Sequence, residues 1–82
     1  NPSTKIKFTT PSVIANGVKQ SQFVTLKVYD IIGNEVATLV NEEKTAGTYE
    51  VDFNATGLTS GVYFYTLKTD KFNETKKMLL LR

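Results

Sequence analysis

The densest apolar and aromatic run of this chain lies in 60–68, a segment that begins with a turn-forming Ser-Gly pair. Side chains of a β-strand alternate between its two faces, so the run can be divided into two sets. One set is Tyr63, Tyr65 and Leu67, and the other is Val62, Phe64 and Thr66. Because both sets are largely apolar, we expect a central strand that is covered on both faces over at least its first half.

Five further segments show strand patterns, separated by turn signals about a dozen residues apart. They are 4–10, 23–29, 35–41, 47–54 and 75–82. We expect a charged turn at 42–45, another turn at 69–74, and a long loop at 12–22 with Val13 or Val18 packed against the core. Six strands, or seven if the long loop holds one, together with the absence of a helical period, predict an all-β antiparallel β-sandwich.

Three short motifs carry the turns of this sandwich. Asp30 suits the first position of a type I turn, and Gly33 can take the positive φ that closes the hairpin. Gly-x-Tyr occurs twice, as Gly47 with Tyr49 and as Gly61 with Tyr63. In both copies we expect the glycine to let the backbone turn into the sheet and the tyrosine to point inward.

Composition narrows the chemistry that 82 residues can support. The chain has no His and no Cys, which removes the commonest general base, metal ligand and thiol nucleophile. Ten basic and eight acidic residues are interspersed, a pattern that is unlike a nucleic-acid footprint. We therefore expect no enzymatic activity, cofactor, metal, nucleic acid or small-molecule substrate.

Five segments, in order and spacing, resemble the C-terminal sorting domain of the type IX (Por) secretion system, type A. They are 1–8, 24–40, 46–49, 60–65 and 75–82. The resemblance covers nearly the whole chain, except the loop between Pro11 and Phe23, which is longer than the family pattern. The pattern is also similar to the Ig-like domain of the flagellar hook-capping protein. Either likeness implies an Ig-like sandwich.

The sorting-domain resemblance implies a function. Residues 1–82 would be a single C-terminal domain of a larger exported protein from a Bacteroidota-like bacterium, delivered to the outer membrane, the cell surface or the medium. Its partners would be secretion-system outer-membrane proteins, a processing peptidase that cuts upstream of Asn1, and an N-terminal cargo in the same polypeptide.

The final segment is the predicted recognition site. It consists of Lys76, Lys77, Met78, Leu79, Leu80, Leu81 and Arg82. On alternation, Met78 and Leu80 face one side, and Lys77, Leu79 and Leu81 face the other, so a thin domain leaves at least one apolar set incompletely covered. A terminal strand can also be captured by strand addition or exchanged with a neighbour, which predicts a monomer or a strand-swapped dimer.

Two other functions fit the same pattern. An accessory Ig-like module could bind carbohydrate through aromatic side chains, although alternation places Tyr49, Tyr63 and Tyr65 mainly in the core. A structural spacer within a multidomain extracellular enzyme is the other alternative. The abrupt end of a basic and then apolar run at Arg82 favours the sorting domain.

Overall fold

The computed structural model describes residues 3–11, 14–15, 17–70 and 72–81, and every helix or strand assigned there is a β-strand. The strands are β1 (Ser3–Thr10), β2 (Ile14–Ala15), β3 (Val18–Lys19), β4 (Gln22–Tyr29), β5 (Glu35–Lys44), β6 (Gly47–Asn54), β7 (Gly61–Thr69) and β8 (Phe72–Leu80). No helix in this described part is long and apolar enough to span a membrane.

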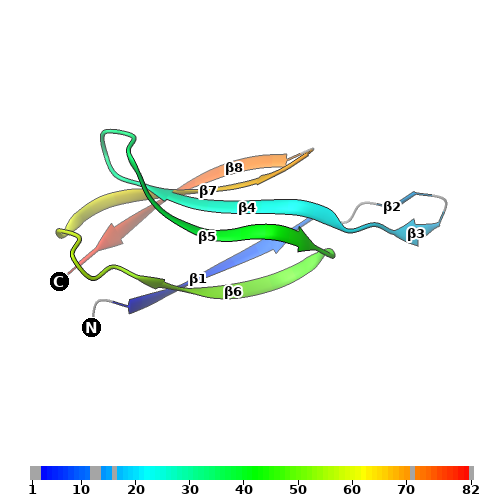
Figure 1. Cartoon of the computed structure of the whole chain (residues 1–82), viewed down its shortest axis with the longest axis horizontal. Helices are drawn as coiled ribbons and strands as arrows, with labels where there is room; N and C mark the ends of the chain where they lie inside the picture. The colour runs from blue at the N-terminus through cyan, green and yellow to red at the C-terminus, as the bar shows by residue number, and fades with distance from the viewer. Residues whose placement is uncertain (1–2, 12–13, 16, 71, 82) are drawn as a thin grey trace.

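The six long strands form two antiparallel sheets (Figure 1). The larger sheet has the order β5-β4-β7-β8, and the smaller one is the pair β1-β6. The short strands β2 and β3 pair with each other and extend from one end of the molecule (Figure 1). The predicted antiparallel β-sandwich is therefore confirmed, and its architecture is consistent with the Ig-like class.

The core lies between the two sheets. From the larger sheet, Val24, Leu26 and Val28 of β4 are each 0% exposed. From the smaller sheet come Ile6 and Phe8 of β1 and Phe53 of β6, all buried in the same cluster. Complete burial of a Val, Leu or Phe side chain contributes roughly 1.5–3 kcal/mol. The sandwich is thus held by the inner faces of these strands.

β7 occupies an interior position in its sheet, with β4 on one side and β8 on the other. Tyr63 and Leu67 on its inner face are buried, as predicted. The prediction that both faces are covered is wrong, because Val62 and Phe64 on the outer face are only partly buried. A sandwich of two layers covers one face of each sheet, so the outer face is shielded only by neighbouring side chains of the same sheet.

The predicted charged turn at 42–45 is also wrong, because β5 continues through Lys44. Its last residues pair with the beginning of β4, including Val24 with Glu42 and Gln22 with Lys44. The side chains of Glu42 and Glu43 are exposed. An edge strand tolerates such charges because they discourage pairing with other chains, so charge alone does not signal a turn.

The predicted turn at 69–74 is shorter than expected. β7 ends at Thr69, and β8 already begins at Phe72, which pairs with Thr69 and packs partly buried against the core. Burial of this ring and ladder pairing of the following residues extend β8 toward its N-terminus. Lys71 lies outside the described residues.

The segment 12–22 is not simply a loop. It contains the β2–β3 hairpin, and Gln22 already belongs to β4. The Gln22 side chain is buried and its Nε2 donates a hydrogen bond of 2.7 Å to the Pro11 carbonyl, which ties the two ends of the segment together. Of the two valines predicted as candidates for packing against the core, Val18 is 60% exposed and does not do so, and Val13 lies outside the described residues.

We predict that Leu26→Ala destabilises the fold by about 2–5 kcal/mol, because it leaves a cavity at a fully buried position between the sheets. The measurement is the free energy of unfolding from a urea titration followed by tyrosine fluorescence. Leu79→Ala is the control, since Leu79 is 63% exposed and its substitution should change stability by no more than about 0.5 kcal/mol. Equal losses in the two variants would contradict the placement of the core.

Candidate functional site

The C-terminal strand β8 is an edge strand of the larger sheet. It pairs with β7 over its whole length, from Thr69 with Phe72 to Gly61 with Leu80. In the described part of the chain, no strand pairs with its other side. The backbone groups on that side are therefore available for pairing with an added strand.

The inner face of β8 changes character along the strand. At its C-terminal end Leu80 is buried and Met78 packs partly buried on the core. In its middle, Glu74 and Lys76 are exposed, and their charged atoms lie 4.0 Å apart. Inward-facing charges on an edge strand oppose strand addition, because pairing there would desolvate them. The free edge is thus protected around 74–76 and unprotected at its C-terminal end.

The outer face of β8 exposes apolar side chains at the same end. Leu79 is 63% exposed and Leu81, just beyond the strand, is 74% exposed. Leu79 pairs across the sheet with Val62 of β7, and Lys77 pairs with Phe64. The predicted alternation of Met78 and Leu80 against Lys77 and Leu79 is therefore present. Arg82, the last residue of the predicted site, lies outside the described residues.

The hairpin between β4 and β5 is closed by Asp30. Its Oδ1 accepts hydrogen bonds from the backbone N–H groups of Ile32 at 3.1 Å and Asn34 at 2.8 Å, and its carbonyl accepts one from Gly33 N–H at 3.0 Å. Gly33 has φ 93°, a left-handed conformation that a residue with a Cβ adopts only with strain. These bonds define the shape of the loop at 30–34.

The loop carries two exposed apolar residues that the sequence analysis did not select. Ile31 is 70% exposed and Ile32 is 78% exposed. The available signal was an Ile-Ile pair inside a turn bounded by Asp30 and Gly33, because turns are usually built from small and polar residues.

The two Gly-x-Tyr motifs share one hydrogen-bond geometry. The Tyr63 hydroxyl donates to the Thr59 carbonyl at 2.9 Å, and the Tyr49 hydroxyl donates to the Thr45 carbonyl at 2.5 Å. In each case the acceptor is four residues before the tyrosine, so the ring braces the turn that leads into its strand. Gly61, which opens β7, has φ 152°.

The aromatic rings proposed above as a carbohydrate platform are packed against protein. Tyr63 is 5% exposed. Tyr49 stacks on Phe8 with ring centroids 5.5 Å apart, and Lys44 Nζ lies 4.4 Å from the centroid of the Tyr49 ring. Tyr65 is partly buried. Tyr63 is thus unavailable to a ligand, and Tyr49 and Tyr65 are partly covered by other residues of the domain.

The predicted residues fall into two groups in space. Gly61 and Tyr63 pair directly with Leu80 and Met78 of β8, so one Gly-x-Tyr motif supports the C-terminal strand. Asp30 lines a surface hollow together with Gly61 and Tyr63, which places the β4–β5 loop beside the same region. Gly47 and Tyr49 belong to β6 in the smaller sheet and lie apart from this site.

Comparison with known proteins identifies the family. The family model of the secretion system C-terminal sorting domain matches residues 1–81. The chain belongs to this family. Its function is that of a C-terminal sorting signal for type IX secretion, carried on a cargo polypeptide that is exported to the cell surface or the extracellular space. No curated protein and no solved structure matches the chain.

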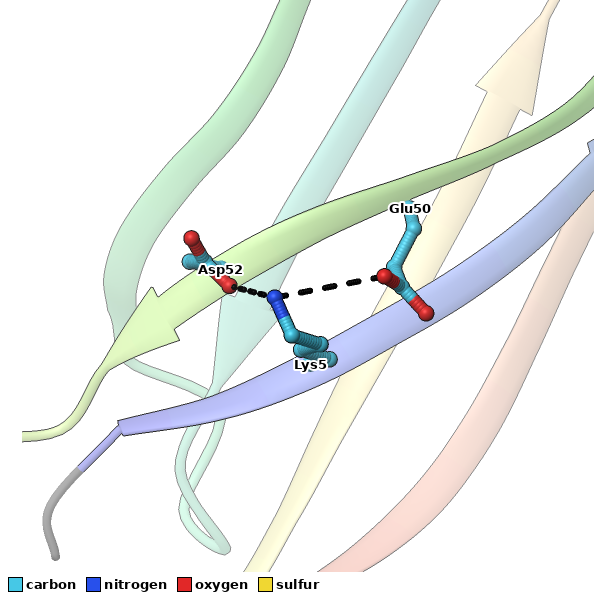
Figure 2. A network of polar contacts seen from close by, with 3 residues as sticks. All are labelled: Lys5, Glu50 and Asp52. Carbon is cyan, nitrogen blue, oxygen red and sulfur yellow. Dashed lines mark hydrogen bonds and ion pairs between the residues drawn. The ribbon is translucent and has the colours of Figure 1, made fainter.

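In the described part of the chain, some lysines of this sorting domain have ion-pair partners, and others do not. On the smaller sheet, Lys5 Nζ donates a hydrogen bond of 2.9 Å to Asp52 Oδ1 and lies 3.9 Å from Glu50 Oε1 (Figure 2). The hydrogen bond to Asp52 and the negative charges of both carboxylates raise the pKa of Lys5. By contrast, no described residue forms an ion pair with Lys77 on β8.

The carboxylate of Glu35 at the start of β5 is also held in its charged form. It accepts a hydrogen bond of 2.9 Å from the Thr38 hydroxyl and lies 3.1 Å from Lys27 Nζ. These two interactions, the Thr38 bond first, lower the pKa of Glu35. On the outer face of the larger sheet, Lys27 therefore has an ion-pair partner in Glu35, whereas Lys77 on the same face has none among the described residues.

We predict that the Lys5 side chain titrates above its ordinary pKa of 10.5 and that Asp52→Asn lowers this midpoint more than Glu50→Gln does. The reason is that Asp52 supplies the hydrogen bond and the closer charge. NMR detection of the lysine side chain during a pH titration measures the effect. Since the folded-state pKa is raised, the stabilising contribution is present below the unfolded pKa and is lost as the pH rises through the folded value. An unchanged midpoint in the Asp52 variant would contradict the assignment.

Proposed function

We propose that a secretion-system outer-membrane protein binds the C-terminal end of β8, and that this contact is the signal by which the domain directs its cargo to export. Supporting this proposal is one observation above all: Leu79 is 63% exposed beside the unpaired edge of the strand. A side chain with this exposure contributes little to the core of the domain. Its exposure is understandable if another protein covers it.

Two interactions would combine at this site. The partner's backbone pairs with the free edge of β8, and its apolar side chains cover Leu79 and Leu81. The exposed Glu74 and Lys76 restrict pairing to the strand's C-terminal end. Backbone pairing supplies affinity with little dependence on sequence, so the alternating side chains at the end of β8 supply specificity.

The domain acts without catalysis in this proposal. Residues 1–82 form a single module at the C-terminal end of a larger polypeptide, and a peptidase of the secretion system separates it from the cargo upstream of Asn1. A monomer suffices, because β8 pairs with β7 of its own chain. A strand-swapped dimer would use the same β7–β8 pairing between two copies.

The experiment that tests the proposal must separate recognition from folding. Deletion of Met78 to Arg82 would also remove Leu80, which is buried, and would therefore weaken the sandwich itself. A point substitution at Leu79 removes the exposed side chain and leaves the core unchanged. Val18 of β3 offers a matched control, because it is 60% exposed and lies on the hairpin at the opposite end of the molecule (Figure 1).

We predict that Leu79→Ser reduces export of a fluorescent cargo fused to this domain in a bacterium that has a type IX system. Loss of an apolar contact of this size costs about 1.5 kcal/mol, which corresponds to roughly tenfold weaker binding. The measurement is the extracellular and surface-bound fraction of the cargo relative to the periplasmic fraction. Val18→Ser should export like the unaltered fusion. If both variants are exported equally well, the C-terminal strand is not the recognised surface.

A further inference from the structure

The exposed apolar surface of β8 continues beyond that strand. Leu79 pairs across the sheet with Val62, close to the start of β7. Val62 in turn lines a surface hollow of about 330 Å³, whose lining also includes Ile31 and Ile32 of the β4–β5 loop together with polar residues such as Asp30 and Ser60. Val62 therefore links Leu79 to the two isoleucines, and we call these four residues the composite surface.

The two parts of the composite surface come from distant positions in the chain. In Figure 1 the β4–β5 loop and the C-terminal end of β8 lie at the same end of the molecule, and the β2–β3 hairpin lies at the other. Between them runs the start of β7, which the Tyr63–Thr59 hydrogen bond braces. The larger sheet thus brings the loop and the terminal strand together.

The loop presents its isoleucines in a defined geometry. Both Oδ1 hydrogen bonds of Asp30 and the bond from Gly33 N–H to the Asp30 carbonyl close the turn around them. A partner that binds a preorganised loop loses less conformational entropy than one that must order it. At 70% and 78% exposure, Ile31 and Ile32 contribute little to the core, so the chain gains no comparable stability from them.

The charges around the composite surface indicate what it would bind. Lys77 pairs across the sheet with Phe64, two residues before Leu79 and on the same outer face, and no described residue forms an ion pair with it. Of the nearby acidic groups, Glu35 is paired with Lys27. The Asp30 carboxylate lines the hollow and accepts backbone hydrogen bonds, which come from neutral donors and do not offset its charge. Beside Leu79, Lys77 is therefore a positive charge without an ion-pair partner among the described residues.

We propose that the composite surface docks an apolar projection of the secretion-system protein, with a carboxylate of that protein beside Lys77. The apolar side chain would enter the hollow between the β4–β5 loop and the start of β7, while Leu79 covers its flank. This inference rests on the proposed function, because it extends the recognition site from β8 to a second element. Recognition then depends on residues about fifty positions apart in the chain.

The test uses the cargo fusion and the export measurement described above. In the Ile31→Ser/Ile32→Ser variant we expect export to fall about tenfold, as for Leu79→Ser, because a comparable apolar contact is lost. Ile31→Leu/Ile32→Leu, which keeps apolar side chains in the same turn, should retain most of the export. Lys77→Glu should reduce export further than Lys77→Gln, since it reverses the charge that faces the partner.

The outcomes separate the two proposals. Normal export of the serine double variant, with a loss for Leu79→Ser, would overturn the composite surface and leave the role of β8 intact. Normal export of both would overturn the proposed function as well. Resistance of the fused domain to protease, compared between variants, shows that the sandwich is folded; a variant that is folded and not exported supports the proposal.

A second copy of this chain is the competing occupant of the surface. Light scattering of the purified fusion distinguishes it from a secretion-system protein. A dimer that the serine double variant dissociates would assign the surface to self-association and overturn the proposal, whereas a monomer in both proteins supports it.

Discussion

The structure depends on apolar burial between a four-stranded sheet and a two-stranded sheet. The smaller sheet provides Ile6, Phe8 and Phe53, which meet the fully buried side chains of β4 and the inner face of β7. The two strands of the smaller sheet cannot cover the inner faces of all four strands of the larger sheet. The middle of β8 therefore carries the exposed pair Glu74 and Lys76 on its inner face, whereas both ends of that strand, Phe72 and the pair Met78 and Leu80, contact the core. Most features of the molecule follow from this imbalance.

The same strand that completes the core is the one that remains accessible. Leu80 is buried between the sheets while Leu79, its neighbour, points away from them and is exposed. Folding thus has a direct consequence for the sorting function: the presentation of Leu79 beside a free strand edge requires Leu80 to be docked. An unfolded chain would expose both residues without a defined edge. The geometry of the signal is therefore inseparable from the stability of a small sandwich.

The hydrogen bonds of the turns hold this region in place. Tyr63 braces the entry to β7, and Asp30 closes the neighbouring loop. Both groups lie at the end of the larger sheet where β8 finishes, next to the hollow lined by Ile31 and Ile32. In the smaller sheet, the Tyr49 hydroxyl forms the corresponding hydrogen bond at the entry to β6. At this end of the molecule, the polar side chains of Asp30 and Tyr63 form hydrogen bonds with the backbone of their own turns. The exposed apolar side chains are therefore the groups that distinguish this end for a binding partner.

The amino-acid sequence by itself determined the fold class, the inward and outward alternation of the strands, and the family. Alternation is local, since successive side chains of a strand point to opposite faces; it placed Tyr63 and Leu67 on one face of their strand and separated Leu80 from Leu79, but it did not say which of these two leucines is buried. Sequence analysis failed where pairing decides the outcome: 42–44 and 72–74 look like turns but are strands, because each has a partner strand to satisfy its backbone. It also could not show that Val62 and Phe64 are only partly buried.

Only the tertiary structure decided which apolar residues share a surface. Ile31 and Leu79 are 48 positions apart in the printed sequence, and each alone is an ordinary exposed side chain. The order β5-β4-β7-β8 places the β4–β5 loop beside the start of β7 and β7 beside β8, which joins the two into one surface. Strand order within a sheet arises from long-range pairing and sheet-on-sheet burial. A local sequence pattern does not encode it, so the composite surface was visible only in the folded chain.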